Sequence, residues 1–381
     1  MILAGDCIEQ MKTLETDSVD AIVTDPPYGL EFMGKDWDGF GTPLGFQTWT
    51  EQWAREALRV LKPGGHLLAF GGTRMYHRLA AGIEDAGFEI RDTLMWLYGS
   101  GFPKSHNLKD EWQGWGTALQ PAVEPLVMAR KPLIGTVAEN VLTHSTGALN
   151  IDASRIGTEK RPLLDARNTV IPSQFGSMQG SKAIGETNLG RWPANILLDE
   201  AAAALLDEQS GVQKDGVAVK RNGSNFETNI YQSGIGKMPV GTPDSGYGGA
   251  GGASRFFYVA KASRSERNKG LEGLEQKDTQ KWNGEVGKRG VGDYYPDGTL
   301  RPRTPERNIH PTVKPVQLMR YLIRLVTPKG GTVLDPFLGS GTTAVAAIEE
   351  GVAWIGCERE PEYLEIIEAR VAAAQPGMDL R

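Results

Sequence analysis

The sequence predicts an α/β protein with a doubly wound, Rossmann-like and mostly parallel sheet. Short apolar runs, typical of buried strands, alternate with stretches of helical period at both ends of the chain. Acidic residues stand at the end of several of these runs, Asp25 and Asp335 among them. Because ligands bind at the carboxyl ends of the strands in open parallel sheets, these positions mark one edge of the sheet as the site.

One half of the sheet is expected within residues 1–130. Asp6 follows the first strand, and Pro63-Gly64-Gly65 stops the first long helix. Trp96 and Tyr98 stand at the start of a glycine-punctuated loop over 98–116, where they either line a base pocket or belong to the core. Strands are expected over 2–4, 19–24, 66–70, 88–97 and 124–130, and helices over 46–61 and 73–86.

Between residues 131 and 254 the alternation of strands and helices lapses. Glycine and polar residues crowd 176–190 and 211–252, interrupted by a strand over 194–198 and an Ala-rich helix over 200–209 that ends at Gly211. A structureless run of this length is uncommon inside a compact domain. The sequence therefore predicts an inserted recognition region, 131–254, with some mobile loops, between the two halves of one domain, 1–130 and 255–381.

Basic residues gather in one part of an acidic chain. The net charge is −6, but residues 255–324 hold 15 Lys and Arg against 8 Asp and Glu, which leaves −13 for the remainder. Such a segment is typical either of a polyanion-binding surface or of a solvated charged loop. A strand over 255–260 is followed by a loop over 263–305 with Trp282, Tyr294 and Tyr295, and aromatic residues among basic ones suit contact with nucleic acid.

The other half of the sheet is expected in the last third of the chain. The segment His310-Pro311-Thr312-Val313-Lys314-Pro315 leads into a helix with Pro315 in its first turn. A strand over 332–334 then precedes a glycine loop and an Ala-rich helix to Glu350, which Gly351 ends. The last expected strand, over 352–357, ends at Glu358.

Composition excludes several classes of protein. With 381 residues, 40% hydrophobic and 23% charged, the chain is typical of a soluble globular protein with a sizeable core. No apolar run approaches the ~20 residues of a membrane span and no signal peptide is recognisable, so we expect a cytoplasmic protein with no membrane partner. Cys7 and Cys357 are too few for a disulfide framework, and the five His show no ligand spacing, so no metal site is expected.

The segment Asp25-Pro26-Pro27-Tyr28 closes the apolar run over 19–24. Because Pro26 and Pro27 lack an N–H, the turn offers a carbonyl and the Asp25 carboxylate as acceptors, with Tyr28 as a stacking surface. This set suits a planar ring that carries an exocyclic amino group. Taken alone, the four residues are more typical of a structural turn that closes a strand over a buried Tyr.

A second chemical motif is Asp335-Pro336-Phe337-Leu338-Gly339-Ser340-Gly341-Thr342-Thr343, with Glu358 19 residues beyond Gly339. A strand, a glycine turn, a helix and an acid after the next strand form a dinucleotide-fold arrangement, in which the acid accepts from a ribose diol. The motif lacks the Lys of a phosphate-binding loop, and Asp335 would repel a pyrophosphate but attract an ammonium. S-adenosylmethionine, which joins adenosine to an amino acid through a sulfonium, fits these charges.

In this order, the segments resemble the β group of S-adenosylmethionine-dependent amino DNA methyltransferases, which methylate adenine N6 or cytosine N4. Residues 25–28 match the catalytic motif of that family, 335–343 its cofactor loop, 310–315 the segment before the loop, and Gly5-Asp6-Cys7 the end of its first strand. The resemblance covers about 1–135 and 255–370. It implies a methyltransferase sheet with circularly permuted motif order and an inserted target-recognition region.

The resemblance implies roles for the catalytic turn. Asp25 and the Pro26 carbonyl, held by Pro27, would accept hydrogen bonds from the target amino group and localise its lone pair toward the methyl donor. Tyr28 would stack on a base flipped out of double-stranded DNA. No covalent intermediate is implied, and neither cysteine follows a Pro as carbon-5 cytosine chemistry would require.

Cofactor roles follow from the same resemblance. Glu358 would bind the ribose hydroxyls, Asp335 the methionine ammonium, and Asp6 the adenine amino edge, although Asp6 is equally suited to cap the next helix. Lys314 with Thr312 would meet the carboxylate end of the cofactor, and His310 would have a minor structural role. The loop itself would contribute Phe337, Gly339, Ser340, Gly341 and Thr342.

The expected function is therefore site-specific methylation of adenine N6 in DNA, because the catalytic motif opens with Asp. Cytosine N4 methylation is the alternative, since members with that specificity more often open with Ser. Methyltransferases of RNA bases or glutamine amides usually open with Asn and reverse the motif order, and a catalytically silent DNA-binding protein is a further alternative. A homodimer and a cognate restriction enzyme are partners that the resemblance allows.

Overall fold

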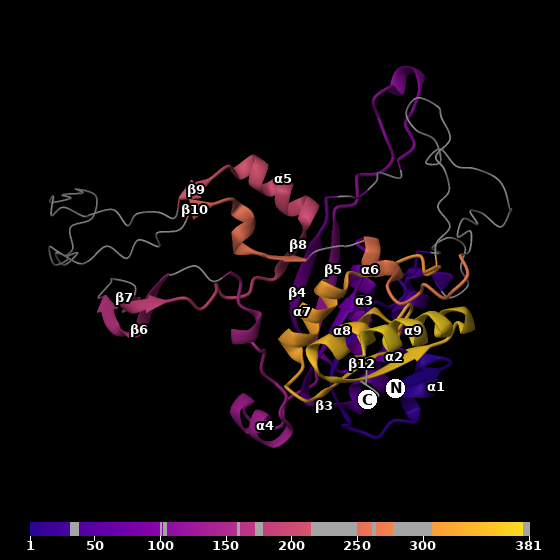
Figure 1. Cartoon of the computed structure of the whole chain (residues 1–381), viewed down its shortest axis with the longest axis horizontal. Coiled ribbons are helices and arrows are strands. Elements are labelled where there is room, and N and C mark those ends of the chain that lie inside the picture. The colour runs from indigo at the N-terminus through magenta and orange to yellow at the C-terminus, as the bar shows by residue number, and fades with distance from the viewer. Residues whose placement is uncertain are drawn as a thin grey trace.

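The computed structural model describes residues 1–30, 38–99, 101, 105–157, 161–171, 178–214, 250–260, 264–276 and 307–375. These residues form a nine-stranded sheet with helices on both faces (Figure 1). The strands lie in the order β1-β13-β12-β2-β3-β5-β4-β8-β11, and among the strands of this sheet only β5 runs antiparallel to its neighbours. The predicted α/β class and doubly wound sheet are confirmed.

The N-terminal half of the chain supplies the strands β1 (Ile2–Ala4), β2 (Val19–Thr24), β3 (Leu61–Phe70), β4 (Glu89–Leu97) and β5 (Val123–Arg130), and the helices α1 (Cys7–Lys12), α2 (Pro43–Val60) and α3 (Tyr76–Asp85). The C-terminal half supplies α6 (Arg264–Asn268), α7 (Val316–Val326), β12 (Thr332–Asp335), α8 (Thr342–Glu350), β13 (Ala353–Glu358) and α9 (Pro361–Ala374). All five strands expected in the first half and both expected in the last third are present.

The region between the halves contributes to the same sheet. Its strand β8 (Ile196–Asp199) pairs with β4, and β11 (Tyr258–Ala260) pairs with β8. Helix α5 (Glu200–Ser210) ends at Gly211 as expected. The other elements are α4 (Val137–His144), β6 (Arg161–Ile171), β7 (Met178–Thr187), β9 (Gln213–Lys214) and β10 (Ala250–Gly251). The pairs β6–β7 and β9–β10 lie to one side of the layered body (Figure 1).

Two cores lie on opposite faces of the sheet because neighbouring strand residues point to opposite sides. In β2, Ile22 packs with α1, α2 and α3, whereas Val23 packs with α7 and α8. Both residues are fully buried. The central strand between two helical layers explains the unbroken apolar run over 19–24, which is typical of strands covered on both faces.

Several sequence-based boundaries were wrong. β3 begins at Leu61, five residues before the expected strand, and α2 begins at Pro43 after Thr42, whose hydroxyl accepts from the Gly45 N–H at 2.9 Å. The expected strand over 255–260 is correct only for β11, because Ala253–Phe256 forms a 3-10 turn. The loop over 98–116 includes a further 3-10 turn, Asp110–Trp112. Helix α9, α4 and the β6–β7 pair were not anticipated.

Two expectations fall outside the described residues. Most of the glycine-rich stretch over 211–252, expected to be mobile, lies there, as do Trp282, Tyr294 and Tyr295. The division into 1–130, 131–254 and 255–381 stays a prediction.

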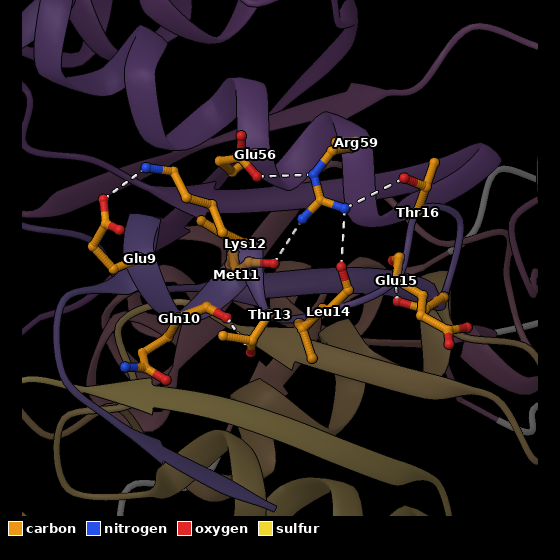
Figure 2. A network of polar contacts seen from close by, with 11 residues as sticks. Glu9, Gln10, Met11, Lys12, Thr13, Leu14, Glu15, Thr16, Glu56 and Arg59 are labelled. Carbon is orange, nitrogen blue, oxygen red and sulfur yellow. Dashed lines mark hydrogen bonds and ion pairs between the residues drawn. The ribbon is translucent and has the colours of Figure 1, made fainter.

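Arg59, near the end of α2, fixes the end of α1. Its guanidinium donates to the carbonyls of Met11 at 2.7 Å and Leu14 at 2.9 Å, and to Thr16 Oγ1 at 3.3 Å, while Glu56 accepts from Nε at 2.9 Å (Figure 2). A cation at the carboxyl end of a helix satisfies carbonyls that lack intrahelical partners and complements the helix dipole. The short α1, which carries Asp6 at its other end, is thereby fixed to the body of the protein.

Candidate active site

The two chemical motifs meet because β2 and β12 are neighbours. These strands pair in parallel, with Ala21 opposite Val333 and Ile22 opposite Leu334. The turn after β2 and the loop after β12 therefore emerge at the same edge of the sheet. A cavity of about 550 Å³ lies there, which is within the usual range for small-molecule sites. Ten residues predicted from the sequence line it: Asp6, Asp25, Pro26, Pro27, Tyr28, Thr312, Lys314, Phe337, Gly339 and Glu358.

The catalytic turn is held by hydrogen bonds of Tyr28. Its hydroxyl oxygen lies 2.8 Å from Asp25 Oδ1 and 3.0 Å from Glu124 Oε2, so the two carboxylates share its one proton as acceptors. Burial raises the pKa of Tyr28 well above its usual value, and the charges of Asp25 and Glu124 add to this shift, so the phenol stays a donor. Glu124, at the start of β5, was missed by sequence reasoning, because only the sheet order brings it beside the turn.

Lys314 closes this group, which we call the Lys314 cluster: Asp25, Tyr28, Glu124 and Lys314. The ammonium lies 2.6 Å from Asp25 Oδ2, 3.1 Å from Glu124 Oε2 and 3.2 Å from the Tyr28 hydroxyl. Burial opposes the charged form of Lys314, but Asp25 and Glu124 outweigh it and raise its pKa. The contacts of Lys314 are thus to the catalytic turn, and its expected place at the carboxylate end of a cofactor stays a prediction that this geometry does not favour.

Glu358, at the end of β13, lines the cavity and contacts the cofactor loop. It accepts from the Gly339 N–H at 2.7 Å and from the Glu360 N–H at 2.8 Å. Burial raises the pKa of Glu358 to about 7, although these two backbone donors favour the ionised form. Each oxygen retains a further lone pair, so the carboxylate is able to accept from a diol.

The contacts of Asp335 are to neighbouring parts of the fold, and its expected binding of an ammonium stays a prediction. Asp335 is 2% exposed and does not line the cavity. Its carboxylate accepts from the hydroxyls of Thr24 and Thr343, each at 2.5 Å, and from the Phe337 N–H at 3.0 Å. Burial raises its pKa to about 6 against these hydrogen bonds. Asp335 therefore connects the end of β2, the cofactor loop and α8, and it stabilises the loop without lining the cavity.

Ser340, Gly341 and Thr342 likewise do not line the cavity. Arg370 of α9, 3% exposed, donates to the Ser340 carbonyl at 2.7 Å and to the hydroxyls of Ser340 at 3.0 Å and Thr342 at 3.1 Å. Gly341 has φ +81° and precedes α8, a conformation that favours glycine. These contacts hold the loop, and the expectation that these residues touch the cofactor stays a prediction.

Asp6 lines the cavity, as expected, and also caps α1, which was the alternative role. Its Oδ1 accepts from the N–H groups of Ile8 at 3.0 Å and Glu9 at 3.3 Å, which makes it the N-cap of α1. The two roles are compatible because both capping bonds use one of the two carboxylate oxygens.

Three aromatic side chains, which we call the aromatic wall, line part of the cavity. Phe337 lies 5.5 Å from Trp49 and 5.4 Å from Trp53 between ring centroids, and Phe40 lies 4.5 Å from Trp49. Phe40, Trp49 and Phe337 line the cavity. Only Phe337 was expected from the sequence, since the other two come from α2 and the segment before it.

Of the three other residues considered from the sequence, His310 lines the cavity, and Trp96 and Tyr98 do not. His310 lines the cavity, donates from Nδ1 to the Thr312 carbonyl at 2.9 Å, and has its pKa lowered to about 4 chiefly by burial, so it is neutral. Trp96 is 9% exposed and belongs to the core, and Tyr98 lies 5.5 Å from it.

None of the helices in the described part of the chain has the length and apolar character needed to cross a membrane. In the same part of the chain, no group of three or more His, Cys, Asp and Glu side chains is arranged to bind a metal ion.

Comparison with known proteins agrees with this geometry. The chain is 28% identical over 200 residues to the type II methyltransferase M.HindIII of Haemophilus influenzae, which covers 39% of this chain and 64% of that protein. It is 33% identical over 109 residues to M.HinfI of Haemophilus influenzae, covering 25% and 30%. The matches thus span less than two thirds of either relative.

Solved structures give weaker matches. The PvuII cytosine-N4-specific DNA methyltransferase matches with a TM-score of 0.46 and 14% identity, covering 100% of this chain and 87% of that one. M1.HpyAVI in complex with S-adenosylmethionine matches with a TM-score of 0.41 and 16% identity, covering 97% and 98%. Scores this low support no statement about the present chain.

The decisive comparison is with a family model. The model of the N6/N4 methyltransferases, described as DNA methylase, matches residues 19–369. This range includes the catalytic turn, the cofactor loop and every residue of the Lys314 cluster. The chain therefore belongs to the N6/N4 DNA methylase family.

Proposed function

We propose that this protein is a site-specific DNA methyltransferase that transfers a methyl group from S-adenosylmethionine to the exocyclic N6 of a flipped adenine. The observation that carries the proposal is that one cavity is lined both by the catalytic turn 25–28 and by Glu358 with Gly339 of the cofactor loop. A donor and an acceptor bound in one cavity are positioned for direct transfer.

The cavity suits a cationic adenosine derivative. Among its lining residues, all described, six are carboxylates, against Lys314 and Arg359 as the two cations. We assign the ribose hydroxyls to Glu358 and the adenine amino edge to Asp6, with the aromatic wall against the rings. When bound, S-adenosylmethionine supplies an electrophilic methyl group on a sulfonium. The surplus of carboxylates supports binding of its positive charges.

The catalytic turn would act on the target base by accepting hydrogen bonds. The lone pair of an exocyclic amine is delocalised into the ring, and acceptors at Asp25 and the Pro26 carbonyl favour a localised lone pair. The Lys314 cluster would orient the Asp25 carboxylate, because the ammonium and the Tyr28 hydroxyl each contact one of its oxygens. The ring of Tyr28 would stack on the base, a contact worth about 1–3 kcal/mol.

Asp25 as the opening residue of the motif favours adenine over cytosine. Cytosine N4 is the second candidate, since the family model covers both N6 and N4 methylases. We propose double-stranded DNA as the partner. A restriction enzyme and a homodimer are further proposals, the former supported by relatives that are named type II methyltransferases.

The test is transfer of a labelled methyl group from S-adenosylmethionine to unmethylated bacterial DNA by the purified chain, followed by single-molecule sequencing of the product. We expect one modified base within one short sequence motif. Binding of both S-adenosylmethionine and DNA without transfer would favour the alternative of a silent DNA-binding protein and overturn the proposal.

A further inference from the structure

A second cavity lies away from the candidate active site, at the outer edge of the sheet. It has a volume of about 400 Å³ and lies among residues 155–157, Arg191 and residues 254–259. Residues 191 and 254–257 precede β8 and β11, and β11 is the edge strand on this side of the sheet. Three arginines line it, Arg155, Arg191 and Arg255, and we call it the arginine groove.

The backbone holds these arginines in place. Ile156 and Arg191 form an antiparallel bridge, in which each N–H donates to the other's carbonyl, at 2.9 and 2.6 Å. Arg155 donates to Asp152 at 2.8 Å and to the Gly190 carbonyl at 3.2 Å. Arg255 donates to the Gly252 carbonyl at 2.9 Å. The three side chains therefore converge through contacts far apart in sequence, and their grouping is a product of the fold.

Aromatic rings lie against the same guanidinium groups. The Arg191 guanidinium lies 4.7 Å from the centre of the Phe256 ring, Arg255 4.4 Å from the same ring, and Arg155 5.5 Å from the Trp192 ring. Trp192 is 64% exposed and Phe256 is 40% exposed. Stacking on these rings orients the planar guanidinium groups, which is an arrangement suited to recognising phosphate oxygens.

The charge of the groove is opposite to that of the active site. Its nine lining residues, all in described ranges, include the three arginines and neither Asp nor Glu. Asp152 pairs with Arg155, and Asp207 accepts from Ser254 and has its pKa lowered by that contact. A locally positive groove in a chain with net charge −6 marks a site for an anion.

We propose that the arginine groove binds the phosphate backbone of the DNA duplex whose target base enters the active site. The inference rests on the proposed function and extends it with a second contact surface. Five strand spacings separate β2 from β11 in the sheet, which at about 4.8 Å each is roughly 24 Å.

The test compares the double variant Arg155→Gln/Arg191→Gln with Arg55→Gln, a control on α2 that removes an arginine 59% exposed and paired with Glu51. The measurement is the affinity for a fluorescent 30-base-pair duplex of arbitrary sequence between 50 and 200 mM salt. Each lost phosphate contact lowers the slope of log K against log salt by about 0.9, so the double variant should lose about 1.8 and the control nothing. An Arg191→Lys variant, which keeps the charge, should retain most of the slope.

Thermal unfolding and S-adenosylmethionine affinity identify variants that have misfolded, and Arg191→Glu serves as a second, charge-reversed test if the double variant unfolds. A folded variant that keeps the salt slope of the wild type would overturn the inference, and this is the result expected if the groove binds a protein partner. An equal loss of slope in the Arg55→Gln control would also overturn it. Because binding is read without methyl transfer, a chain that keeps the slope difference but methylates nothing would overturn the proposed function and leave the groove standing.

Discussion

The ammonium of Lys314 lies 2.6 Å from Oδ2 of Asp25, although the two residues are 289 positions apart in the chain. The side chain of Lys314 is 8% exposed and that of Asp25 18%. Glu124 shares the same ammonium at 3.1 Å, so two carboxylates and one cation leave the cluster with a net charge of −1. Removing one partner of such a buried group leaves an uncompensated charge.

The charge balance of the Lys314 cluster gives the first prediction. In Lys314→Met the two carboxylates repel each other and take up a shared proton, which removes an acceptor from the target amine. The acid limb of the pH–rate profile should therefore move to higher pH, and along that limb methyl transfer should fall about tenfold for each pH unit. Lys314→Met/Glu124→Gln restores the charge balance and should move the limb back. A pH profile unchanged in Lys314→Met would refute the role.

Asp25 itself gives the second prediction. Asp25→Ala should lower kcat at least about 100-fold, the effect of losing a positioned acceptor in the transition state. Calorimetric affinity for S-adenosylmethionine should change little, because Asp25 contacts Tyr28 and Lys314 and not the cofactor loop. Asp25→Asn serves as the shape-matched control. Weakened cofactor binding with normal turnover at saturation would contradict this role, because it would show that Asp25 contacts the cofactor and not the target base.

Glu358 gives a pH prediction. Burial raises its pKa to about 7, and in the proposed function the ionised form would accept from the ribose. The affinity for S-adenosylmethionine should therefore fall by up to about tenfold from pH 8 to pH 6. Glu358→Gln should bind weakly at both values and lose this dependence. Equal affinities of the wild type at pH 6 and 8 would be inconsistent with a ribose contact.

The raised pKa of Glu358 also makes the free energy of unfolding depend on pH. The ordinary value for Glu358 is 4.5 and the folded value is about 7, so the folded protein binds more protons between these values. Its contribution to the free energy of unfolding is therefore largest below pH 4.5 and is lost as the pH rises through 7. Burial lowers the pKa of His66 to about 4 and thus gives the opposite slope from pH 4 to 6.5.

Two glycines of the cofactor half form a matched pair for the fourth prediction. Gly339 has φ +55°, and an added Cβ would lie 2.8 Å from His310 Nε2, whereas Gly351 has φ +68° and open space around it. Gly351→Ala should lower the free energy of unfolding by about 1–2 kcal/mol through backbone strain alone. Gly339→Ala should also weaken S-adenosylmethionine binding. Equal cofactor affinity in both variants would show that the loop tolerates a side chain beside His310.

Sequence patterns were sufficient for the central strands and for most of the cavity. The run over 19–24 and the loop 335–343 are each local, and the rule that ligands bind at the carboxyl ends of parallel strands places them together. The contacts of Ser340 and Thr342 were not predictable, because they depend on Arg370 in α9, 30 and 28 positions away. Glu124 was missed for the same reason, since β5 enters the sheet between β3 and β4.

Other errors have local causes. The capping box of α4, in which Thr136 and Glu139 bond each other's backbone, was present in the sequence and went unrecognised. The run Arg255-Phe256-Phe257 has the composition of a strand, but the Arg255 side chain bonds the Gly252 carbonyl within a 3-10 turn. Tertiary and side-chain contacts override strand propensity there.

The most direct test of the central claim is the identity of the modified nucleoside. DNA incubated with the purified chain and S-adenosylmethionine is digested to nucleosides and measured by mass spectrometry, with Asp25→Ala as the inactive control. We expect N6-methyladenine with the wild type and none with the variant. N4-methylcytosine alone would contradict the assignment to adenine, and no methylated nucleoside from a folded protein that binds S-adenosylmethionine would contradict the proposed activity.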